Sequence, residues 1–143
     1  PIRIAVMNML WEYKEKSILD LCCGTGNQLK LLEKNGFKDL HCLDISNKML
    51  EIARKKNLTI KIYNEDATKT KFKNESFDIV IISFALHEKD RITQNKIIEE
   101  VYRLIKKEGF ILIVDYHFDN KTDKLINIFR NINILNLKLT IVN

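Results

Sequence analysis

Two glycines and two acidic residues in the first third of the chain have the types and spacing of a nucleoside-binding site. Gly24 and Gly26 form a G-x-G pair four residues after Asp20, and Asp44 lies 20 residues after Gly24. Glycines let the backbone approach a ligand, amides at a following helix start can receive an anionic group, and Asp20 can hold a cationic amine. Asp44 can accept hydrogen bonds from both ribose hydroxyls. A G-x-G pair alone is equally typical of a tight turn, so the interpretation depends on the acids.

The elements that must position these residues alternate between strands and helices. Compact apolar runs predict strands at 17–21, 40–43, 58–63, 77–82 and 110–114. Helical spacing predicts helices near 4–11 and at 29–34, 47–56 and 92–105, and Asn35-Gly36 marks the end of the second of them. The remaining tail is less regular, with a helix expected at 121–131 and one strand at 135–141.

This alternation predicts an α/β fold with a doubly wound, mostly parallel sheet in a single domain over residues 1–143. In such a sheet, ligands bind beyond the carboxyl ends of the strands, at the point where the strand order reverses. The segments expected there are 20–27, 44–45, 66–67, 83–88 and 115–117.

Composition excludes several classes of protein. The 143 residues carry 24 Lys and Arg against 19 Asp and Glu, a net charge of +5 that is dispersed along the chain, so we expect no nucleic-acid partner. The longest apolar stretch, at 79–86, is far below the roughly 20 residues of a spanning helix, so no membrane span is expected. With no signal-peptide pattern at the N-terminus, we expect a cytoplasmic protein.

The 3 cysteines, Cys22, Cys23 and Cys42, contain no C-x-x-C pair. We therefore expect neither a disulfide framework nor a metal site, and a reducing compartment. Cys22 and Cys23 are interpreted as small packing side chains of the glycine loop.

The chain resembles the class I S-adenosylmethionine-dependent methyltransferases, and more closely the small-molecule branch similar to the quinone-biosynthesis C-methyltransferases. The resemblance spans about residues 17–116. It rests on these segments: the glycine motif at 18–26, the acid and helix at 43–50, the segment at 64–67, the strand start at 77–80, and the helix at 100–106 ahead of Gly109.

The resemblance implies a cofactor, S-adenosyl-L-methionine, and a transferase that moves its methyl group to a small-molecule acceptor by in-line displacement. It implies the following binding residues: Asp20, Cys22, Gly24 and Gly26 around the methionine part, Asp44 at the ribose, Ile45 and Met49 on the adenine face, Asp66 and Ala67 at the adenine edge, and Ser83 on the inner side. No metal is implied.

His87, just past the fourth predicted strand, is the candidate catalytic residue. It is placed to face the methyl group and could accept a proton from the acceptor near neutral pH. The alternative is that His87 caps the next helix or binds a loop carbonyl. Asp115, Tyr116 and His117 leave the fifth strand at the same rim, where they either line the acceptor pocket or only end the strand.

Other interpretations remain beside this one. A dinucleotide fits less well, because Leu29 stands where the third glycine of G-x-G-x-x-G belongs and Asp20 would repel a pyrophosphate. Only 16 residues precede the first predicted strand and 29 follow Val114, so the C-terminal strands are expected to be abbreviated. The alternative function is therefore a cofactor-binding module, truncated or regulatory, without its own activity. We also hypothesise a homodimer that completes the open sheet edge.

Overall fold

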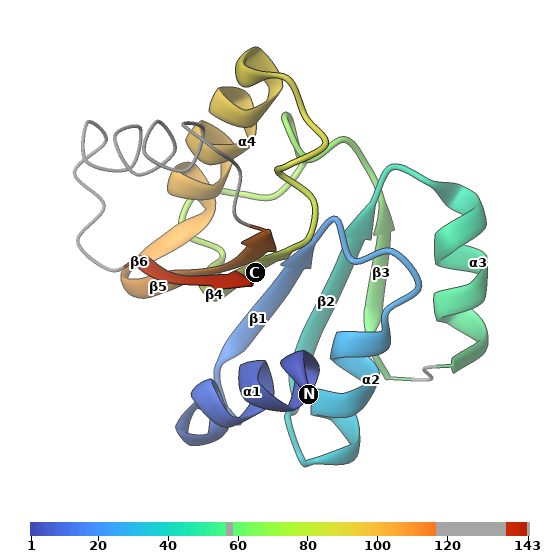
Figure 1. Cartoon of the computed structure of the whole chain (residues 1–143). Coiled ribbons are helices and arrows are strands. Elements are labelled where there is room, and N and C mark those ends of the chain that lie inside the picture. The colour runs from blue at the N-terminus through green and yellow to red at the C-terminus, as the bar shows by residue number, and fades with distance from the viewer. Residues whose placement is uncertain (57–58, 117–136, 143) are drawn as a thin grey trace.

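One parallel sheet forms the centre of the protein (Figure 1). The computed structural model describes residues 1–56, 59–116 and 137–142. The strands are β1 (Ser17–Leu21), β2 (Asp39–Asp44), β3 (Lys61–Asn64), β4 (Phe77–Ser83), β5 (Ile105–Tyr116) and β6 (Leu137–Val142). They lie in the order β3-β2-β1-β4-β5-β6, and every described pairing is parallel. The predicted doubly wound α/β class is confirmed, and the strand order reverses between β1 and β4.

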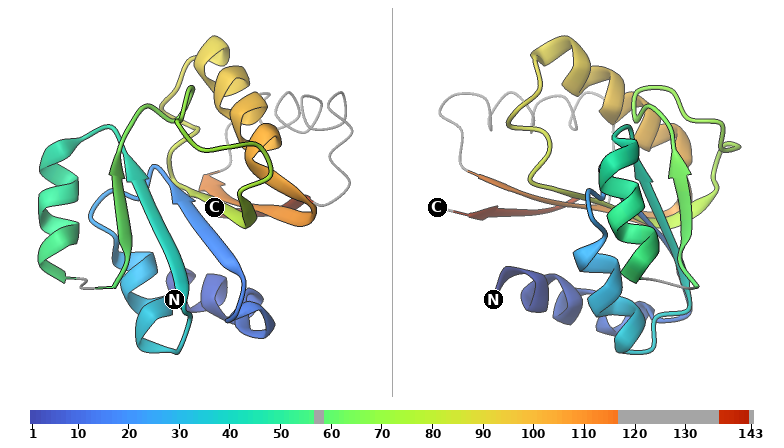
Figure 2. Two further views of the ribbon diagram at one scale, coloured as in Figure 1. Left: turned by 180° about the vertical axis from the view of Figure 1, so that it is seen from behind. Right: turned by 90° about the vertical axis from the view of Figure 1, so that its right-hand side faces the viewer.

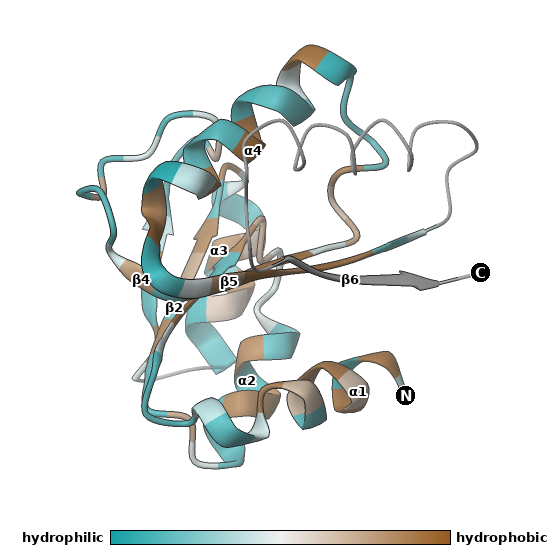
Figure 3. Cartoon of the chain, turned by 90° about the vertical axis from the view of Figure 1, so that its left-hand side faces the viewer, coloured by the Kyte–Doolittle hydropathy of each residue, from teal (hydrophilic) through white to brown (hydrophobic). Residues whose placement is uncertain are grey.

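Helices cover both faces of the sheet. They are α1 (Ile2–Met9), the short 3-10 helix η1 (Trp11–Tyr13), α2 (Asn27–Lys34), α3 (Asn47–Lys56) and α4 (Arg91–Leu104). Figure 2 shows α1 and α2 on one side of the sheet and α4 on the other. Two cores result, one containing apolar residues of α1, α2 and α3 and the other those of α4. Figure 3 shows the apolar strands between them.

Alternation along β1 decides which way Asp20 points. Ile18 belongs to the core under α1 and α2, whereas Leu19 and Leu21 belong to the core under α4. Because successive side chains of a strand point to opposite faces, Asp20 shares the face of Ile18. The carboxylate therefore points to the side of the sheet covered by α1 and α2.

The local signals predicted most helix and strand boundaries well. The strand at 17–21 and the helix at 47–56 are found as predicted, and α2 ends before Gly36, whose φ is +87°. The strand expected at 58–63 is shorter, beginning at Lys61, and it lies at one edge of the sheet. Ser46 caps α3 through its Oγ, which accepts the N–H of Met49 at 3.4 Å.

The prediction for the start of β5 was wrong. We expected a helix at 92–105 and a strand that begins only at Phe110, but α4 ends at Leu104 and the strand begins at Ile105. Ile105 pairs with Phe77, and the next pair joins Phe110 to Ile79, so 106–109 form an irregularity opposite a single residue of β4. The reason is tertiary, because pairing with β4 extends a segment whose local sequence is typical of a turn.

Of the tail, β6 confirms the predicted C-terminal strand and pairs in parallel with β5. The helix predicted at 121–131, and His117, lie outside the described residues. In the part of the chain that the structure describes, no helix is long and apolar enough to span a membrane.

Candidate cofactor and active site

The loop between β1 and α2 has a sharply turned backbone. Cys22, Gly24 and Gly26 have φ values of +65°, +55° and +74°. A Cβ on Gly24 would meet no atom within 4 Å, so the glycine is needed there for its conformation and not for space. Gly26 directly precedes α2, and the turn thus aims the first helical amides at the carboxyl edge of the sheet.

Asp44 ties this loop to the end of β2. Its Oδ2 accepts the N–H of Gly24 at 2.8 Å, and its Oδ1 accepts the N–H of Ser46 at 2.8 Å. Each carboxylate oxygen has further lone-pair capacity for a ligand hydroxyl. Asn64, at the end of β3, donates to the carbonyl oxygens of Asp44 and Ile45 at 3.0 Å each. The residue predicted to bind ribose therefore also holds the glycine loop in place.

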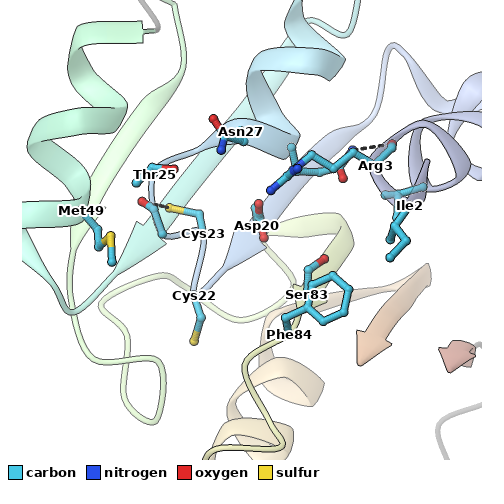
Figure 4. Close-up of a pocket in the computed structure, with 13 residues that line it drawn as sticks. Ile2, Arg3, Asp20, Cys22, Cys23, Thr25, Asn27, Met49, Ser83 and Phe84 are labelled. Atoms are coloured by element: carbon cyan, nitrogen blue, oxygen red, sulfur yellow. Dashed lines mark hydrogen bonds between the residues drawn. The ribbon is translucent and has the colours of Figure 1, made fainter. Parts of the chain in front are cut away.

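A pocket of about 340 Å³ opens at this loop (Figure 4). That volume is within the range of small-molecule sites. Its lining residues are Ile2, Arg3, Val6, Asp20, Cys22, Cys23, Gly24, Thr25, Asn27, Gln28, Met49, Ser83 and Phe84. The pocket thus lies at the ends of β1 and β4, where the strand order reverses, and residues of α1, α2 and α3 complete its wall.

Two buried polar atoms in the pocket have no hydrogen-bond partner among the described residues, Asp20 Oδ1 and Ser83 Oγ. Asp20 is only 3% exposed. Burial, and next the negative charge of Asp44, raise the pKa of Asp20 from 3.8 to about 7, while the positive charge of Arg3 lowers it. A buried carboxylate without a partner destabilises the folded protein. A ligand that brings a cationic amine to this carboxylate removes that cost and therefore binds more tightly.

The pocket collects half of the predicted binding residues: Asp20, Cys22, Gly24, Met49 and Ser83. Asp44 is hydrogen-bonded to Gly24, which lines the pocket. Ile45, directly after β2, is 68% exposed. Gly26, Asp66 and Ala67 are not among the lining residues, and the Asp66 carboxylate accepts the N–H and hydroxyl of Thr68 at 2.8 and 2.7 Å. These hydrogen bonds lower the pKa of Asp66.

The sequence analysis did not predict that α1 and Phe84 line the pocket. Gln28 Nε2 in α2 donates to the Arg3 carbonyl at 3.1 Å, which places Arg3 in the same cavity as Asp20. Figure 4 shows Ile2 and Arg3 on one side of Asp20 and Ser83 and Phe84 on another. A positive φ of 53° at Phe84 turns the chain sharply after β4. No local motif signals a role for Arg3, since only tertiary packing brings it to the loop.

The expectation of free cysteines was wrong for two of the three. Cys23 and Cys42 form a disulfide with their Cα atoms 5.6 Å apart. The reason is the way the loop returns toward β2, where the Cys23 N–H donates to the Leu43 carbonyl at 3.0 Å. The argument from cysteine usage for a reducing compartment therefore does not hold. Cys22 stays a free thiol and packs against the core under α4, as a packing residue would.

We expect thiol counting to separate these cysteines. Burial raises the pKa of Cys22 to about 12, so its thiol stays protonated and reacts slowly with an alkylating reagent at neutral pH. The folded protein should show no fast thiol, the unfolded unreduced protein one, and the unfolded reduced protein 3. A Cys22→Ser variant should lose the single thiol of the unreduced state. Three thiols before reduction would contradict the disulfide.

His87 lies outside the pocket lining but is connected to it by aromatic contacts. Phe84 packs on Tyr116 with ring centroids 4.9 Å apart, and Tyr116 packs edge-on against His87 at 5.1 Å. His87 Nδ1 lies 2.6 Å from Oδ1 of the buried Asp115. The alternative that His87 caps α4 is wrong, because Asp90 is the cap and accepts the N–H of Thr93 at 2.8 Å.

The parallel sheet whose strand order reverses between β1 and β4, the glycine loop after β1 and the acidic Asp44 after β2 are the features of a nucleoside-binding domain of the Rossmann-like class. A profile of the methyltransferase domain family matches residues 18–109, which is more than half of the chain. The chain therefore belongs to this family of methyltransferase domains. S-adenosylmethionine is the cofactor of the class, and the unpartnered Asp20 carboxylate fits its cationic amino group.

Individual relatives agree with this assignment. The chain is 41% identical over 106 residues to the demethylmenaquinone methyltransferase of Leptospira interrogans, covering 68% of this chain and 42% of that protein. It is 30% identical over 114 residues to the demethylmenaquinone methyltransferase of Thermotoga maritima, covering 79% of this chain and 49% of that protein. The chain thus spans less than half the length of these two curated relatives.

A solved structure shows the same architecture. The S-adenosylmethionine dependent methyltransferase of Mesorhizobium loti superposes with a TM-score of 0.65 at 28% identity, covering 76% of this chain and 50% of that one.

Proposed function

We propose that this domain binds S-adenosylmethionine in the pocket at the glycine loop and transfers its methyl group to a small-molecule acceptor. The observation that carries the proposal is the buried Asp20 carboxylate, whose Oδ1 is without a partner in the described part of the chain. The activated sulfonium of the cofactor supplies the methyl group, and the new bond to the acceptor atom forms as the methyl–sulfur bond breaks.

Charges in the pocket match the amino-acid end of this cofactor. Asp20 supplies a negative charge for the α-ammonium group, and Arg3 supplies a positive charge for the α-carboxylate. Asp44 accepts hydrogen bonds from the ribose hydroxyls and retains its hydrogen bonds from the N–H groups of Gly24 and Ser46. Met49 and the exposed Ile45 offer an apolar surface for the adenine ring. Each end of the ligand thereby meets groups of complementary character.

For the acceptor, we propose an aromatic hydroxy compound of the demethylmenaquinone type in its reduced form. The names of the relatives from Leptospira and Thermotoga support this choice. Phe84 and Tyr116 add an aromatic wall next to Ser83, suited to a flat ring. Holding such a ring in line with the methyl group contributes up to roughly 7–11 kcal/mol in favourable cases.

His87 is the proposed general base. Removing a proton from the ring hydroxyl raises electron density at the neighbouring ring carbon, which then attacks the methyl carbon and afterwards loses its own proton. The His87 ring is about a quarter exposed and touches the Tyr116 end of the aromatic wall.

The second candidate is a cofactor-binding module without turnover of its own. The match to the methyltransferase domain family favours the transferase over this candidate. The two candidates share the cofactor site and differ in the acceptor side. Formation of the demethylated cofactor in the presence of acceptor separates them.

The test is isothermal titration of the chain with S-adenosylmethionine, its demethylated product and NAD. We expect binding of the first two and none of NAD. Asp44→Ala should weaken binding by roughly 10- to 100-fold, the loss of hydrogen bonds to a charged acceptor. The matched control is Asp39→Ala, which removes a carboxylate at the opposite end of β2. Equal affinity for NAD, or an equal loss in both variants, would contradict the proposal.

A further inference from the structure

A disulfide joins the glycine loop to the neighbouring strand. Cys23 lies in the loop between β1 and α2, and Cys42 lies in β2, 19 residues further along the chain. Cys23 lines the pocket beside Gly24 and is only partly buried. Cys42 does not line the pocket and is 1% exposed. One sulfur of the bond thus belongs to the wall of the pocket and the other to the core.

Cys42 is the fixed end of this bond. It pairs in register with Asp20 of β1 on one side and with Ile62 of β3 on the other. Its side chain packs in the core that contains apolar residues of α1, α2 and α3. A buried strand paired on both sides opens less readily than a surface loop. A change in the distance between the two sulfur atoms is therefore taken up by Cys23 and the loop.

The loop around Cys23 has the conformation that the cofactor pocket requires. Directly before it, Cys22 is a non-glycine residue with a φ of +65°, which persists only where the surrounding structure imposes it. Directly after it, the Gly24 N–H donates to Oδ2 of Asp44 at 2.8 Å. The Gly26 N–H donates to the Cys23 carbonyl at 3.0 Å. A displacement of Cys23 therefore also moves the amide that holds the carboxylate proposed to bind ribose.

Reduction of the disulfide releases the loop from β2. Two sulfur atoms that are no longer bonded need more room than a disulfide, so Cys23 moves away from the buried Cys42. The loop also regains conformational freedom, which a bound ligand must then remove at a cost in affinity. The oxidised loop, by contrast, is already ordered before the ligand arrives.

We propose that Cys23 and Cys42 form a redox switch of the cofactor pocket, in which the disulfide form binds S-adenosylmethionine tightly and the dithiol form binds it weakly. The inference rests on the proposed function, which places the cofactor in this pocket. The co-reactant is a low-molecular-weight thiol such as glutathione, together with its disulfide.

The exchange proceeds in two steps that balance. The thiolate of the first small thiol attacks Sγ of Cys23 from the pocket, the bond between the two protein sulfurs breaks, and Cys42 leaves as a thiolate that takes up a proton. A second small thiol attacks the mixed disulfide and releases Cys23, which is protonated in turn. Two electrons and two protons have then passed to the protein, and the two small thiols have become one disulfide. Oxidation is the reverse reaction.

Cys22 stays outside this exchange, although it is adjacent to Cys23. Its side chain packs against the core under α4, whereas Cys23 and Cys42 belong to the core on the other face of the sheet. Burial also raises the pKa of the Cys22 thiol to about 12, so little of the reactive thiolate is present. Cys22 therefore provides the matched control for substitutions of the other two cysteines.

Isothermal titration of the full chain with the demethylated product of the cofactor tests the switch. One preparation carries the disulfide and the other is reduced with dithiothreitol, and thiol counting after unfolding verifies each state. We expect the reduced chain to bind roughly 5- to 150-fold more weakly, the usual range for coupling between two sites. Cys42→Ala should bind like the reduced wild type with or without dithiothreitol, and Cys23→Ser should do the same. Cys22→Ser should retain the ratio between the two states.

Equal affinities of the oxidised and reduced wild type overturn the inference alone. No binding in either state contradicts the proposed function as well. A dithiol form that binds more tightly than the disulfide form also overturns the inference.

Thermodynamic linkage supplies a second readout, which a purely structural disulfide would not change. A ligand that prefers the oxidised chain by a given factor must shift the thiol–disulfide equilibrium by the same factor. In glutathione buffers, saturating demethylated cofactor should therefore raise the ratio of squared thiol to disulfide concentration at half-reduction by the factor found in the titration. Alkylation of the trapped thiols measures this midpoint, and NAD at the same concentration should leave it unchanged. A midpoint that the demethylated cofactor does not shift, or lowers, overturns the inference.

Discussion

Replacing Asp20 by asparagine should weaken binding of S-adenosylmethionine by roughly 10- to 100-fold, the usual range for loss of a hydrogen bond to a charged group. The reason is that the buried Oδ1, without a partner among the described residues, meets the cationic amino group only as a carboxylate. Titration calorimetry of the wild type and Asp20→Asn measures the change. Unchanged affinity of the variant would contradict the assignment of Asp20.

The same substitution should stabilise the folded chain at alkaline pH. The pKa of Asp20 is raised from 3.8 to about 7 in the folded state, mainly by burial. A raised carboxyl pKa means that the folded state holds its proton longer than the unfolded chain, so wild-type stability from this group falls as pH rises from about 4 to about 7. Above about pH 7, the buried ionised carboxylate of Asp20 lowers the free energy of unfolding by up to about 4 kcal/mol. An uncharged asparagine does not have this cost.

Urea unfolding at low and high pH measures this effect. The increase in the free energy of unfolding of Asp20→Asn over the wild type should be small near about pH 4 and reach its full size near about pH 8. Asp39→Asn serves as the control, since that carboxylate is half-exposed at the other end of the neighbouring strand. The affinity of the wild type for the cofactor should fall about tenfold per pH unit below about pH 7. A less stable Asp20→Asn at high pH would show that the charge is compensated in the free protein.

The second large effect is expected at Gly109, where alanine should destabilise the protein by about 3 kcal/mol or more. A Cβ at this position would lie 2.4 Å from the carbonyl oxygen of Asp78 and 3.1 Å from Cγ2 of Ile105. The obstacle cannot move easily, because the Asp78 carboxylate is held by the N–H and hydroxyl of Ser17 at 2.9 Å each. The close approach exists because β5 carries extra residues opposite Asp78.

Gly36→Ala is the matched control for this prediction. Gly36 has a φ of +87°, but a Cβ there would meet only the Lys14 Cδ at 4.0 Å. We expect a cost of about 1–2 kcal/mol from the backbone conformation alone. Urea unfolding should therefore give a clearly lower free energy of unfolding for Gly109→Ala than for Gly36→Ala. The reverse order would mean that the strand irregularity at Gly109 relaxes without cost.

Local sequence determined the parts of this protein whose signals are local. The apolar run that ends at Leu21, the glycines that follow it and the helical spacing at 47–56 predict β1, the turn and α3 with almost the observed boundaries. The parallel class follows from the alternation of such runs, and the position of Asp20 at a strand end follows from its place in the first of them. These features depend on side-chain periodicity and turn conformation, which neighbouring residues specify.

Tertiary structure alone decided the features that join distant segments. The strand start at Ile105, the disulfide from Cys23 to Cys42, the contribution of Arg3 to the pocket and the contact of His87 with Asp115 each link residues from different elements. No periodicity encodes them, because which loop returns to which strand depends on how the helices pack on the two faces of the sheet. The sequence by itself thus determined the elements and the residues at their ends, and packing decided which of those residues meet.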